Sequence, residues 1–539
     1  MTGRPDQASP FAQIVSRAAP AARRNVAAML QDAAETRGDR RHITIGSQSL
    51  SFVQARDHAA AQAGLLAASG IKRGDRIALM CANRIECLTM LYGCFWLGAV
   101  VVPINIALRG AQLAHAIRLS SPRVLVVDGA MLQHLQPLEP FADSLDILAL
   151  DKASIPAGFK TFEPPAHASP YPLQSFEPGD PGAILFTSGT TGPSKGALCP
   201  MAQFYWWAQY QTAAMSVDAQ SVIYNPLPLF HINALNSVTQ SLLTGARCVI
   251  GQRFSASRFW QEAAQAGATH SAIIGAMADI LLAQPDGPWD RAHPIRTVLA
   301  SSVRADTWAT LSSRFGIPRR VGGYGSTETN LVFNSDDGWE TQGNMGFAAN
   351  GFEAQVVDEQ DNPLADGSAG ELVVRSHVPF AFALGYWGMP DATVSAWRNL
   401  WFHTGDRVVR NRDGRFRFVG RLKESIRRRG ENISAWEVEQ ALLGHPSIAE
   451  AAVYGVEAAL GDEEVMATLV LRAGASLNPA ELIAFLEPRL AKFAIPRFID
   501  FGDTLPLTDT GKIRRGELKA RGVSPTTWDR EQESPTRRR

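Results

Sequence analysis

The sequence predicts an α/β protein: a large N-terminal domain of doubly wound sheets with a small antiparallel barrel-like part, followed by a small α+β domain. The chain has 539 residues, too many for one hydrophobic core. Up to about residue 320, apolar runs alternate with segments of helical periodicity, which indicates largely parallel strands joined by helices. Over residues 352–375, short alternating segments with Asn-Pro and Asp-Gly turns indicate antiparallel strands.

The first part of the chain alternates helices and strands. In order, we expect helices over 25–37 and 52–69, a strand over 76–81, an apolar helix from residue 86, a strand over 99–102, a helix over 111–119 and a strand over 123–127. The apolar run Leu88–Ile104 is shorter than a usual membrane span and contains Gly93, Gly98 and Pro103. It therefore predicts a buried helix and strand rather than a membrane span.

The rest of the chain predicts a domain boundary near residue 420. Before it we expect a proline-rich connection over 128–180, strands over 183–186 and 221–225, a helix over 201–210, further alternation to 320 and a second antiparallel segment over 407–419. After it we expect helices over 437–443 and 479–492 and strands over 451–456 and 465–471. The predicted parts are an N-terminal domain (1–420), a C-terminal domain (421–520) and a disordered tail (521–539).

Charge and cysteine content narrow the function classes. Lys plus Arg equals Asp plus Glu, 52 each, so neither nucleic acid nor an anionic membrane is indicated as a partner. The five cysteines are odd in number and form no C-x-x-C pair, and the polar N-terminus lacks an apolar signal core. These features predict reduced, buried thiols in a cytoplasmic protein. The oligomeric state, a homodimer included, stays open.

The stretch Thr187–Gly196 is the first candidate site. It follows the apolar run Ala183–Phe186 and consists almost wholly of glycines, hydroxyl residues and Lys195. Glycines let backbone N–H groups converge and the hydroxyls add donors, which suits a polyphosphate, although a solvated linker is the alternative interpretation. It is not the G-x-x-x-x-G-K-[ST] loop, because only two residues separate Gly192 from Lys195 and glycine stands where that motif needs Ser or Thr.

Four further polar clusters follow along the chain. Gly322–Thr329 offers an aromatic ring, hydroxyls and a carboxylate, and Trp401–Asp406 ends in a carboxylate at a turn. Gly420–Ile426 supplies an arginine, and Asp509–Arg514 places a lysine on a glycine turn. Each cluster alone has a structural explanation, such as a core tyrosine, a turn aspartate or a solvated basic side chain.

Together and in this order, the five clusters resemble the motifs of the adenylate-forming superfamily, which includes acyl-CoA synthetases, adenylation domains of peptide synthetases and luciferases. The resemblance runs from about Asn25 to about Leu518. Within the superfamily, Arg428–Ser434 is similar to crotonobetaine/carnitine–CoA ligases, whereas Pro228–Ser237 is similar to coumarate–CoA ligases. The two similarities therefore indicate different acids.

The resemblance implies an ATP-dependent, AMP-forming acyl-CoA ligase. A carboxylate attacks the α-phosphate of Mg-ATP to give acyl-AMP and pyrophosphate, and the thiol of coenzyme A then displaces AMP. Both steps develop charge on phosphate or carbonyl oxygens, so fixed donors and cations are the expected tools. Two alternatives stay open: an enzyme that loads a separate carrier protein, and a non-catalytic nucleotide sensor. The presence of Lys195, Glu328, Asp406 and Lys512 argues against the sensor.

The resemblance also implies the nucleotide contacts of the first two clusters. Tyr324, with Gly325, would lie against adenine, Thr327 would reach the α-phosphate and Glu328 would help to hold Mg²⁺. The β- and γ-phosphates would be held by the loop residues Thr187, Ser188, Gly189, Thr190, Thr191, Gly192 and Lys195.

The remaining clusters are expected to complete the nucleotide site from the C-terminal side. Asp406 would accept both ribose hydroxyls, and Arg421 would contact ribose or phosphate. Lys512 would bridge the attacking carboxylate and the α-phosphate, and it would be delivered by a mobile C-terminal domain that pivots at Lys423.

The thiol and acyl sites are also implied by the resemblance. Gly430, Glu431 and Asn432 would line the CoA channel, and the neighbouring arginines 427–429 are either a solvated basic turn or contacts to CoA phosphates. His231 would stand between the acyl and pantetheine pockets, with a satisfied core histidine as the alternative.

The acyl pocket is expected to have small or polar walls. Such walls favour a short or polar-substituted acid over a long alkyl chain. Trp206 and Trp207 indicate either an aromatic cage for a trimethylammonium group or helix packing. The expected pocket residues are Asn233, Asn236, Ser237, Ile274, Gly275, Ser301, Ser302 and Gly323.

Overall fold

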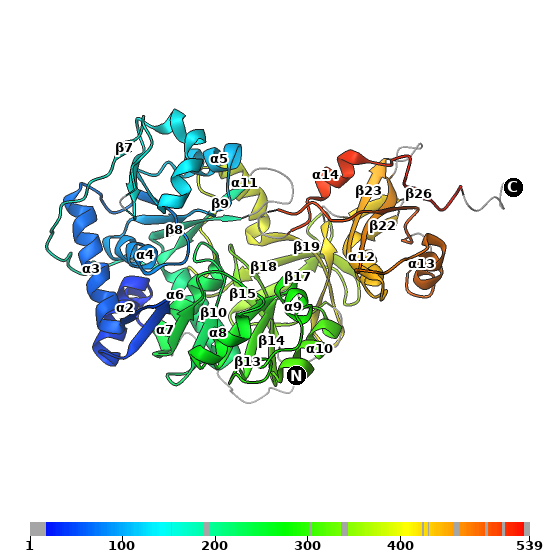
Figure 1. Ribbon diagram of the computed structural model, residues 1–539, viewed down its shortest axis with the longest axis horizontal. Coiled ribbons are helices and arrows are strands. Elements are labelled where there is room, and N and C mark those ends of the chain that lie inside the picture. Colours follow the sequence, from blue (N-terminus) through cyan, green and yellow to red (C-terminus); the bar gives the residue numbers. More distant parts are fainter. Residues whose placement is uncertain are drawn as a thin grey trace. The chain divides into compact units, whose positions relative to one another are not determined.

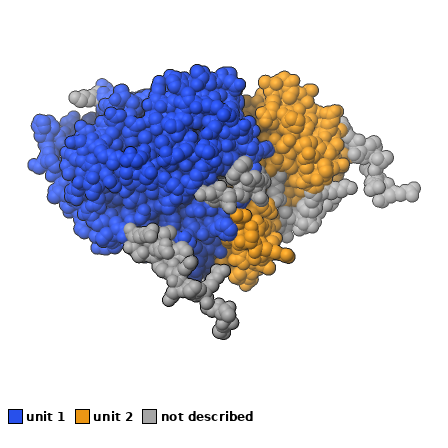
Figure 2. All heavy atoms as spheres, turned by 90° about the horizontal axis from the view of Figure 1, so that it is seen from below, with its two compact units in different colours: residues 1–354, 374–402 blue, residues 355–373, 403–539 orange. Residues whose placement is uncertain are grey.

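The chain divides into two compact units. Unit 1 runs to Ala354 and includes Val374–Phe402, and unit 2 comprises Gln355–Val373 and the chain from His403 onward (Figure 2). Unit 2 therefore contains more than the predicted C-terminal domain, and the domain boundary at residue 420 stays a prediction. The computed structural model describes residues 18–532 except 152, 188–193, 302, 336–342, 423–424, 429–430, 458–462, 491–493 and 509–511.

The first sheet of unit 1 has the strand order β7-β6-β5-β3-β4-β8-β9. In that order the strands span Lys160–Thr161, Asp146–Ala149, Val124–Val127, Arg76–Met80, Val100–Pro103, Pro181–Thr187 and Lys195–Pro200. Neighbours pair in parallel from β7 to β8, and β9 is antiparallel to β8. The helices α3 (Phe52–Ala68) and α4 (Ile85–Leu97) lie side by side, and α5 (Gly110–Ser120) links β4 to β5 (Figure 1).

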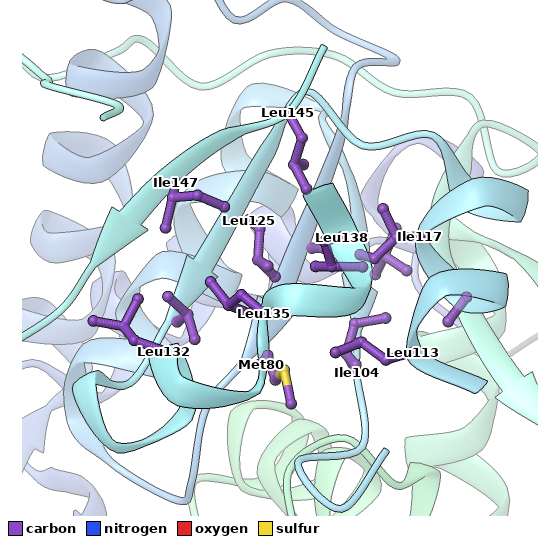
Figure 3. Close-up of a cluster of buried hydrophobic side chains, with 14 of the residues drawn as sticks. Met80, Ile104, Leu113, Ile117, Leu125, Leu132, Leu135, Leu138, Leu145 and Ile147 are labelled. Atoms are coloured by element: carbon purple, nitrogen blue, oxygen red, sulfur yellow. The ribbon is translucent and has the colours of Figure 1, made fainter. Parts of the chain in front are cut away.

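A cluster of buried aliphatic side chains fixes α5 to this sheet. Figure 3 shows Leu113 and Ile117 of α5 in one cluster with Leu125 of β5 and Ile147 of β6. The 3-10 turns η2 (Gly129–His134) and η3 (Gln136–Phe141) add further leucines to the same cluster. Burial of this apolar surface compensates the entropy lost by ordering a segment that the sequence predicts only as a connection.

The second sheet of unit 1 has the strand order β16-β15-β14-β13-β12-β10-β11-β1-β2. In that order the strands span Asn344–Ala348, Asn330–Ser335, Arg319–Ser326, Thr297–Ser301, His270–Ile274, Val222–Asn225, Arg247–Ile250, Arg41–Ile45 and Gln48–Ser51. Pairing is parallel from β14 to β1, and β2, β15 and β16 are antiparallel to their neighbours. The associated helices are α2 (Val26–Arg37), α6 (Met201–Met215), α7 (Ile232–Thr244), α8 (Phe259–Ala266), α9 (Gly275–Leu282), α10 (Ala305–Phe315) and α11 (Pro390–Ala396).

The described part of unit 2 consists mainly of antiparallel strand pairs and helices, and its first three strands each include one or more residues of unit 1. Its strands order as β17-β18-β19-β20, as the hairpin β21-β22, and as β23-β24-β25-β26. Their bounds are Phe352–Val357, Ala369–Ser376, Phe402–Arg410, Phe416–Arg421, Ser425–Arg428, Glu431–Ser434, Ile448–Glu457, Glu463–Leu471, Phe498–Phe501 and Trp528–Asp529. The helices are α12 (Ala435–Leu443), α13 (Pro479–Leu486) and α14 (Arg515–Arg521). The alternating sheet-and-helix part and the smaller α+β part both agree with the predicted fold class.

The end of the chain corrects one prediction. Residues 522–532 are ordered, although a disordered tail was expected from residue 521. β26 pairs antiparallel with β25, and Arg497 donates to both carboxylate oxygens of Asp529 at 3.0 and 3.1 Å. A half-buried charge pair thus holds a strand too short to give a periodic signal. Among the described residues, no helix combines the length and apolarity required to cross a bilayer.

Candidate active site

The β8–β9 hairpin of unit 1 carries the predicted phosphate loop. Thr187 and Lys195 are cross-strand partners at its end, and Thr187 Oγ1 donates to the carbonyl oxygen of Lys195 at 3.4 Å. His115 on α5 lies 2.9 Å from the carbonyl oxygen of Ser194 through its Nε2 atom. The predicted loop members Ser188, Gly189, Thr190, Thr191 and Gly192 lie outside the described residues.

The segment 383–387 connects this hairpin to the Gly322–Thr329 cluster. The backbone N–H groups of Leu384 and Trp387 each donate to a carbonyl oxygen of β9 at 2.8 Å. The N–H group of Ala383 donates to the carbonyl oxygen of Glu328, also at 2.8 Å. Two predicted clusters far apart in the sequence are therefore held together by a third segment that no prediction included.

Tyr386 is the centre of this contact. Its hydroxyl donates to Glu328 Oε1 at 2.9 Å, and Lys195 Nζ lies 4.6 Å from its ring centroid. Tyr386 is 9% exposed and Glu328 is 7% exposed. Burial, together with the negative charge of Glu328, raises the pKa of Tyr386 well above its usual range. The hydroxyl therefore keeps its proton and acts as the donor.

The chain around Tyr324 approaches its neighbours closely. Tyr324 lies on β14 with its ring edge-on to Phe333, with the ring centroids 5.8 Å apart. A Cβ atom at Gly325 would lie 2.0 Å from the carbonyl oxygen of Asn330, so no other residue fits there without a backbone shift. Gln203 on α6, fully buried, donates from Nε2 to the carbonyl oxygen of Thr327 at 2.9 Å.

The predicted acyl-pocket residues gather at the carboxyl ends of neighbouring parallel strands. Ile274 at the end of β12 and Ser301 at the end of β13 are register partners, and Gly275 opens α9. Gly323 lies on β14, the next strand along. This edge is where open parallel sheets bind ligands. Ser302 lies outside the described residues.

The first turns of α7 form a polar network at the same edge. Asn225, at the end of β10, donates from Nδ2 to Asn233 Oδ1 and to Ser237 Oγ, both at 2.8 Å. Asn236 is buried and donates to Gln211 of α6. Asn225, Asn233 and Ser237 are thus hydrogen-bonded to one another, whereas the buried Oδ1 atom of Asn236 accepts no hydrogen bond from the described residues.

The structure decides between the two interpretations of Trp206 and Trp207. Trp206 and Trp207 are buried in α6, 0% and 1% exposed, and Trp206 Nε1 donates to the carbonyl oxygen of Pro379. The aromatic-cage hypothesis is therefore wrong, because neither ring offers a free face, and helix packing is confirmed. His231 is half-buried at the N-cap of α7 and lies beside Phe230, with ring centroids 4.6 Å apart.

In unit 2, Asp406 and Arg421 are cross-strand partners on β19 and β20. Arg421 Nε lies 2.7 Å from Asp406 Oδ1. The carboxylate side chain is 3% exposed and the guanidinium side chain 42% exposed. The arginine is thus the member of the pair that meets solvent.

Lys512 lies on a short turn with a firmly held base. The turn is closed by hydrogen bonds from Thr508 N–H to the Lys512 carbonyl oxygen at 2.6 Å and from Lys512 N–H to Thr508 Oγ1 at 3.0 Å. Three residues later, Arg515 Nη2 donates to both oxygens of the buried Glu439 on α12, at 2.7 and 2.8 Å. Lys512 itself is exposed.

The predicted thiol channel and hinge are only partly described. Glu431 and Asn432 belong to β22, of which the backbone is described, and Lys423 and Gly430 lie outside the described residues. Arg428 is 4% exposed and its Nε lies 2.6 Å from Glu464 Oε2. The interpretation of Arg428 as part of a solvated basic turn is therefore wrong, and its charge is already paired inside unit 2.

Comparison with known proteins gives consistent matches over nearly the whole chain. Residues 30–387 match the family described as AMP-binding enzyme, and residues 437–512 match its C-terminal domain. The chain is 30% identical over 514 residues to the crotonobetaine/carnitine–CoA ligase of Salmonella paratyphi A, covering 92% of this chain and 99% of that protein.

Solved structures of the same fold span the chain as well. A benzoate CoA ligase from Burkholderia xenovorans LB400 matches with a TM-score of 0.81 at 25% identity, covering 92% of this chain and 99% of that one. The ATP-bound MatB of Rhodopseudomonas palustris matches with a TM-score of 0.82 at 24% identity over the same shares of both chains. The predicted fold class is confirmed.

Proposed function

This chain belongs to the AMP-binding enzyme family, and from that premise we propose the acid it takes and the part each site residue plays. The chain is an ATP-dependent, AMP-forming acyl-CoA ligase that uses ATP, Mg²⁺ and coenzyme A. It joins a carboxylic acid to CoA through an acyl-adenylate, with release of pyrophosphate and AMP. We propose that the acid is short or polar-substituted.

The contact of Lys195 and Glu328 through Tyr386 carries the proposal of a nucleotide site in unit 1. The ammonium group of Lys195 and the buried carboxylate of Glu328 both contact the same aromatic side chain. Glu328 Oε2 accepts no hydrogen bond from the described residues, so the carboxylate has an oxygen free for a hard cation. These residues fit Mg²⁺, which when bound would neutralise charge on the phosphates of ATP.

In unit 1 the proposed roles follow from this contact. Lys195 and Thr187 bind the β- and γ-phosphates, and the Thr327 hydroxyl donates to the α-phosphate. Tyr324 stacks on adenine, where the close approach of Gly325 to Asn330 fixes the backbone beside it. Each of these groups binds or orients ATP, and none forms a covalent bond to it, so catalysis rests on positioned charge.

In unit 2 we propose that Asp406 binds the ribose hydroxyls. These hydroxyls would replace Arg421 as the hydrogen-bonding partners of the carboxylate. Because the guanidinium is the exposed member of the pair, it can turn toward phosphate or solvent. Lys512 donates to the carboxylate and the α-phosphate during adenylation only. Lys423 as pivot, and Gly430, Glu431 and Asn432 as the thiol channel, stay proposals.

The polar network of α7 supports a short or polar-substituted acid. Asn233 and Ser237 share the amide of Asn225, and Asn236 is paired with Gln211. An alkyl tail beside this network would leave the buried Asn236 Oδ1 without a donor, whereas a polar substituent can donate to it. His231, half-buried at the start of the same helix, is proposed to separate the acyl and thiol pockets.

A panel of acids tests this proposal. AMP release would be measured with and without CoA for crotonobetaine, carnitine, benzoate and o-succinylbenzoate, with palmitate as the long-chain control. We expect CoA-dependent AMP release with at least one short or polar acid and little with palmitate. Release that is fastest with palmitate would overturn the proposed acid class while leaving the ligase assignment intact.

We also propose that the enzyme works in the cytoplasm. All five cysteines are free and buried, which suits a compartment that keeps thiols reduced. Fractionation of cells that produce the protein would test the location, and recovery outside the cytoplasm would contradict it.

A further inference from the structure

Tyr386 makes two different contacts within unit 1. Its hydroxyl donates to Glu328 Oε1, and its ring lies under the ammonium group of Lys195. The remainder of the ring packs edge-on against Trp397 and against the small side chains of Ala197 and Ala383. The two polar contacts join residues from β9 and from the loop after β14.

Packing explains the ring but not the hydroxyl. A phenylalanine would fill the same space beside Trp397, and a buried hydroxyl costs free energy unless it has a partner. That partner is a carboxylate, and a hydrogen bond to an ionised group is both stronger and more directional than one between neutral groups. The hydroxyl therefore fixes the rotation of the Glu328 carboxylate.

We propose that Tyr386 is a positioning residue for the metal and phosphate end of the nucleotide, a role that rests on the proposed function of Glu328 and Lys195. By occupying Oε1, the Tyr386 hydroxyl aims Oε2 of Glu328 at Mg²⁺. The ring holds the Lys195 ammonium group on the same side by cation–π attraction. Outer groups that orient a metal ligand in this way typically change metal affinity 10- to 100-fold when removed.

The test removes the hydroxyl and keeps the ring. Affinity of the full-length protein for the α,β-methylene analogue of ATP would be measured by calorimetry without Mg²⁺ and with saturating Mg²⁺. In Tyr386→Phe, we expect the gain in affinity that Mg²⁺ provides to fall about 10-fold, with the metal-free affinity unchanged. The Mg²⁺ concentration needed for half-maximal adenylation should rise by a similar factor.

Tyr224 provides a matched control. It is 1% exposed, lies in the same unit and donates its hydroxyl to Glu262 Oε2 at 2.6 Å. Tyr224→Phe thus removes a tyrosine–glutamate hydrogen bond, here to a half-buried carboxylate, outside the proposed nucleotide site. It should lower thermal stability about as much as Tyr386→Phe and leave the Mg²⁺-dependent affinity at the wild-type value.

Two further variants distinguish an error in the proposed role of Tyr386 from an error in the proposed role of Glu328. Tyr386→Leu, which also removes the ring, should weaken metal-free binding of the analogue about two- to five-fold. Glu328→Gln should remove most of the Mg²⁺-dependent gain, and an unchanged gain would overturn the proposed metal role of Glu328 itself. If Glu328→Gln loses the gain while Tyr386→Phe keeps it, the positioning role alone is wrong. A folded Tyr386→Phe that binds as the wild type therefore decides against the inference.

Discussion

Lys195 in unit 1 and Lys512 in unit 2 both stand at hairpin-like turns, but their surroundings differ. β9, which begins at Lys195, has β8 on one side and the segment 383–387 on the other, and the ammonium group of Lys195 lies over the Tyr386 ring. Lys512 is exposed, and the base of its turn is anchored by hydrogen bonds between Thr508 and Lys512 and by the pair of Arg515 with Glu439. The first lysine is therefore built as a fixed part of a surface, and the second as a group presented on a short turn.

The same contrast extends to the polar groups that stabilise each unit. Unit 1 holds arginine–carboxylate pairs such as Arg84 with Asp128, but it also buries neutral groups such as His42, which lies 2.8 Å from both Ser241 and Tyr92. Unit 2 relies on arginine–carboxylate pairs, including Arg515 with Glu439 and Arg497 with Asp529. The two units should therefore respond differently to removal of a charge and to acid.

The largest effect is expected from the two lysines. Lys512→Ala should lower the rate of adenylation about 100- to 1,000-fold, because one charge donor to the transition state is lost. Thioester formation from supplied acyl-AMP should change little. Lys195→Ala should raise the KM for ATP more than it lowers kcat, since a binding contact is removed. Rapid-quench measurement of each half-reaction would check both, and equal loss of both half-reactions in Lys512→Ala would remove its proposed role.

The next effect concerns the base of the Lys512 turn. Arg515→Met removes the guanidinium that donates to both oxygens of the buried Glu439 and should lower the stability of unit 2 by about 3–5 kcal/mol. The control Lys519→Met breaks an exposed pair with Glu463 and should cost about 1 kcal/mol or less. Urea unfolding followed by fluorescence would measure both. A similar small loss in the two variants would mean that unit 2 does not depend on the buried pair.

A smaller effect is expected from mild acid on unit 1. Burial lowers the pKa of His42 from 6.5 to about 3. As the pH falls, His42 is therefore protonated in the unfolded chain before it is protonated in the folded protein. Stability should therefore be full above pH 6.5 and be lost between pH 6.5 and 3, by about 1–2 kcal/mol from pH 7 to pH 5. The five buried cysteines all lie in unit 1 and report its opening to dithiodipyridine. His42→Gln should flatten this pH dependence, and an unchanged slope would exclude His42 as its source.

The smallest effect is expected at the end of unit 2. Burial alone would raise the pKa of Asp529, but hydrogen bonds from Arg497 lower the pKa below its usual value, so the pair persists to a lower pH than an ordinary aspartate would allow. Asp529→Asn should weaken the attachment of β26 by about 1 kcal/mol. Hydrogen exchange of the Arg530 amide, which donates to the carbonyl oxygen of Arg497, should then quicken about five-fold. No change in exchange would contradict a stabilising role of this pair.

Local signals predicted much of the fold. Asn25 followed by apolar residues at helical spacing predicts α2, and in the structure Asn25 Oδ1 caps that helix by accepting from Ala28 N–H. The run Leu88–Ile104 forms α4 and β4 as expected. The β1–β2 hairpin was missed because its strands are short and the turn signal is a single Gly46. Such strands depend on pairing with β11, which no local pattern shows.

The site was predicted where its residues form motifs and missed where contact alone joins them. Lys195 and Glu328 stand in glycine-rich stretches whose composition already indicates a site. Tyr386 stands in an ordinary Gly-Tyr-Trp run, and its importance comes from a hydrogen bond to a residue 58 positions earlier. A glycine–aromatic pair before a proline-started helix was the only local signal, and it is common in loops. The solvated-turn prediction for Arg428 was wrong because its partner, Glu464, lies on another strand and no local pattern joins the two.

The central claim is that this enzyme forms an acyl-adenylate before it meets the thiol. The direct measurement is the exchange of labelled pyrophosphate into ATP, with an acid that supports AMP release but with CoA omitted. We predict acid-dependent exchange that does not require CoA and that Lys512→Ala nearly abolishes. Exchange that appears only when CoA is present, or release of phosphate in place of pyrophosphate, would contradict the adenylate and with it the roles given to both lysines.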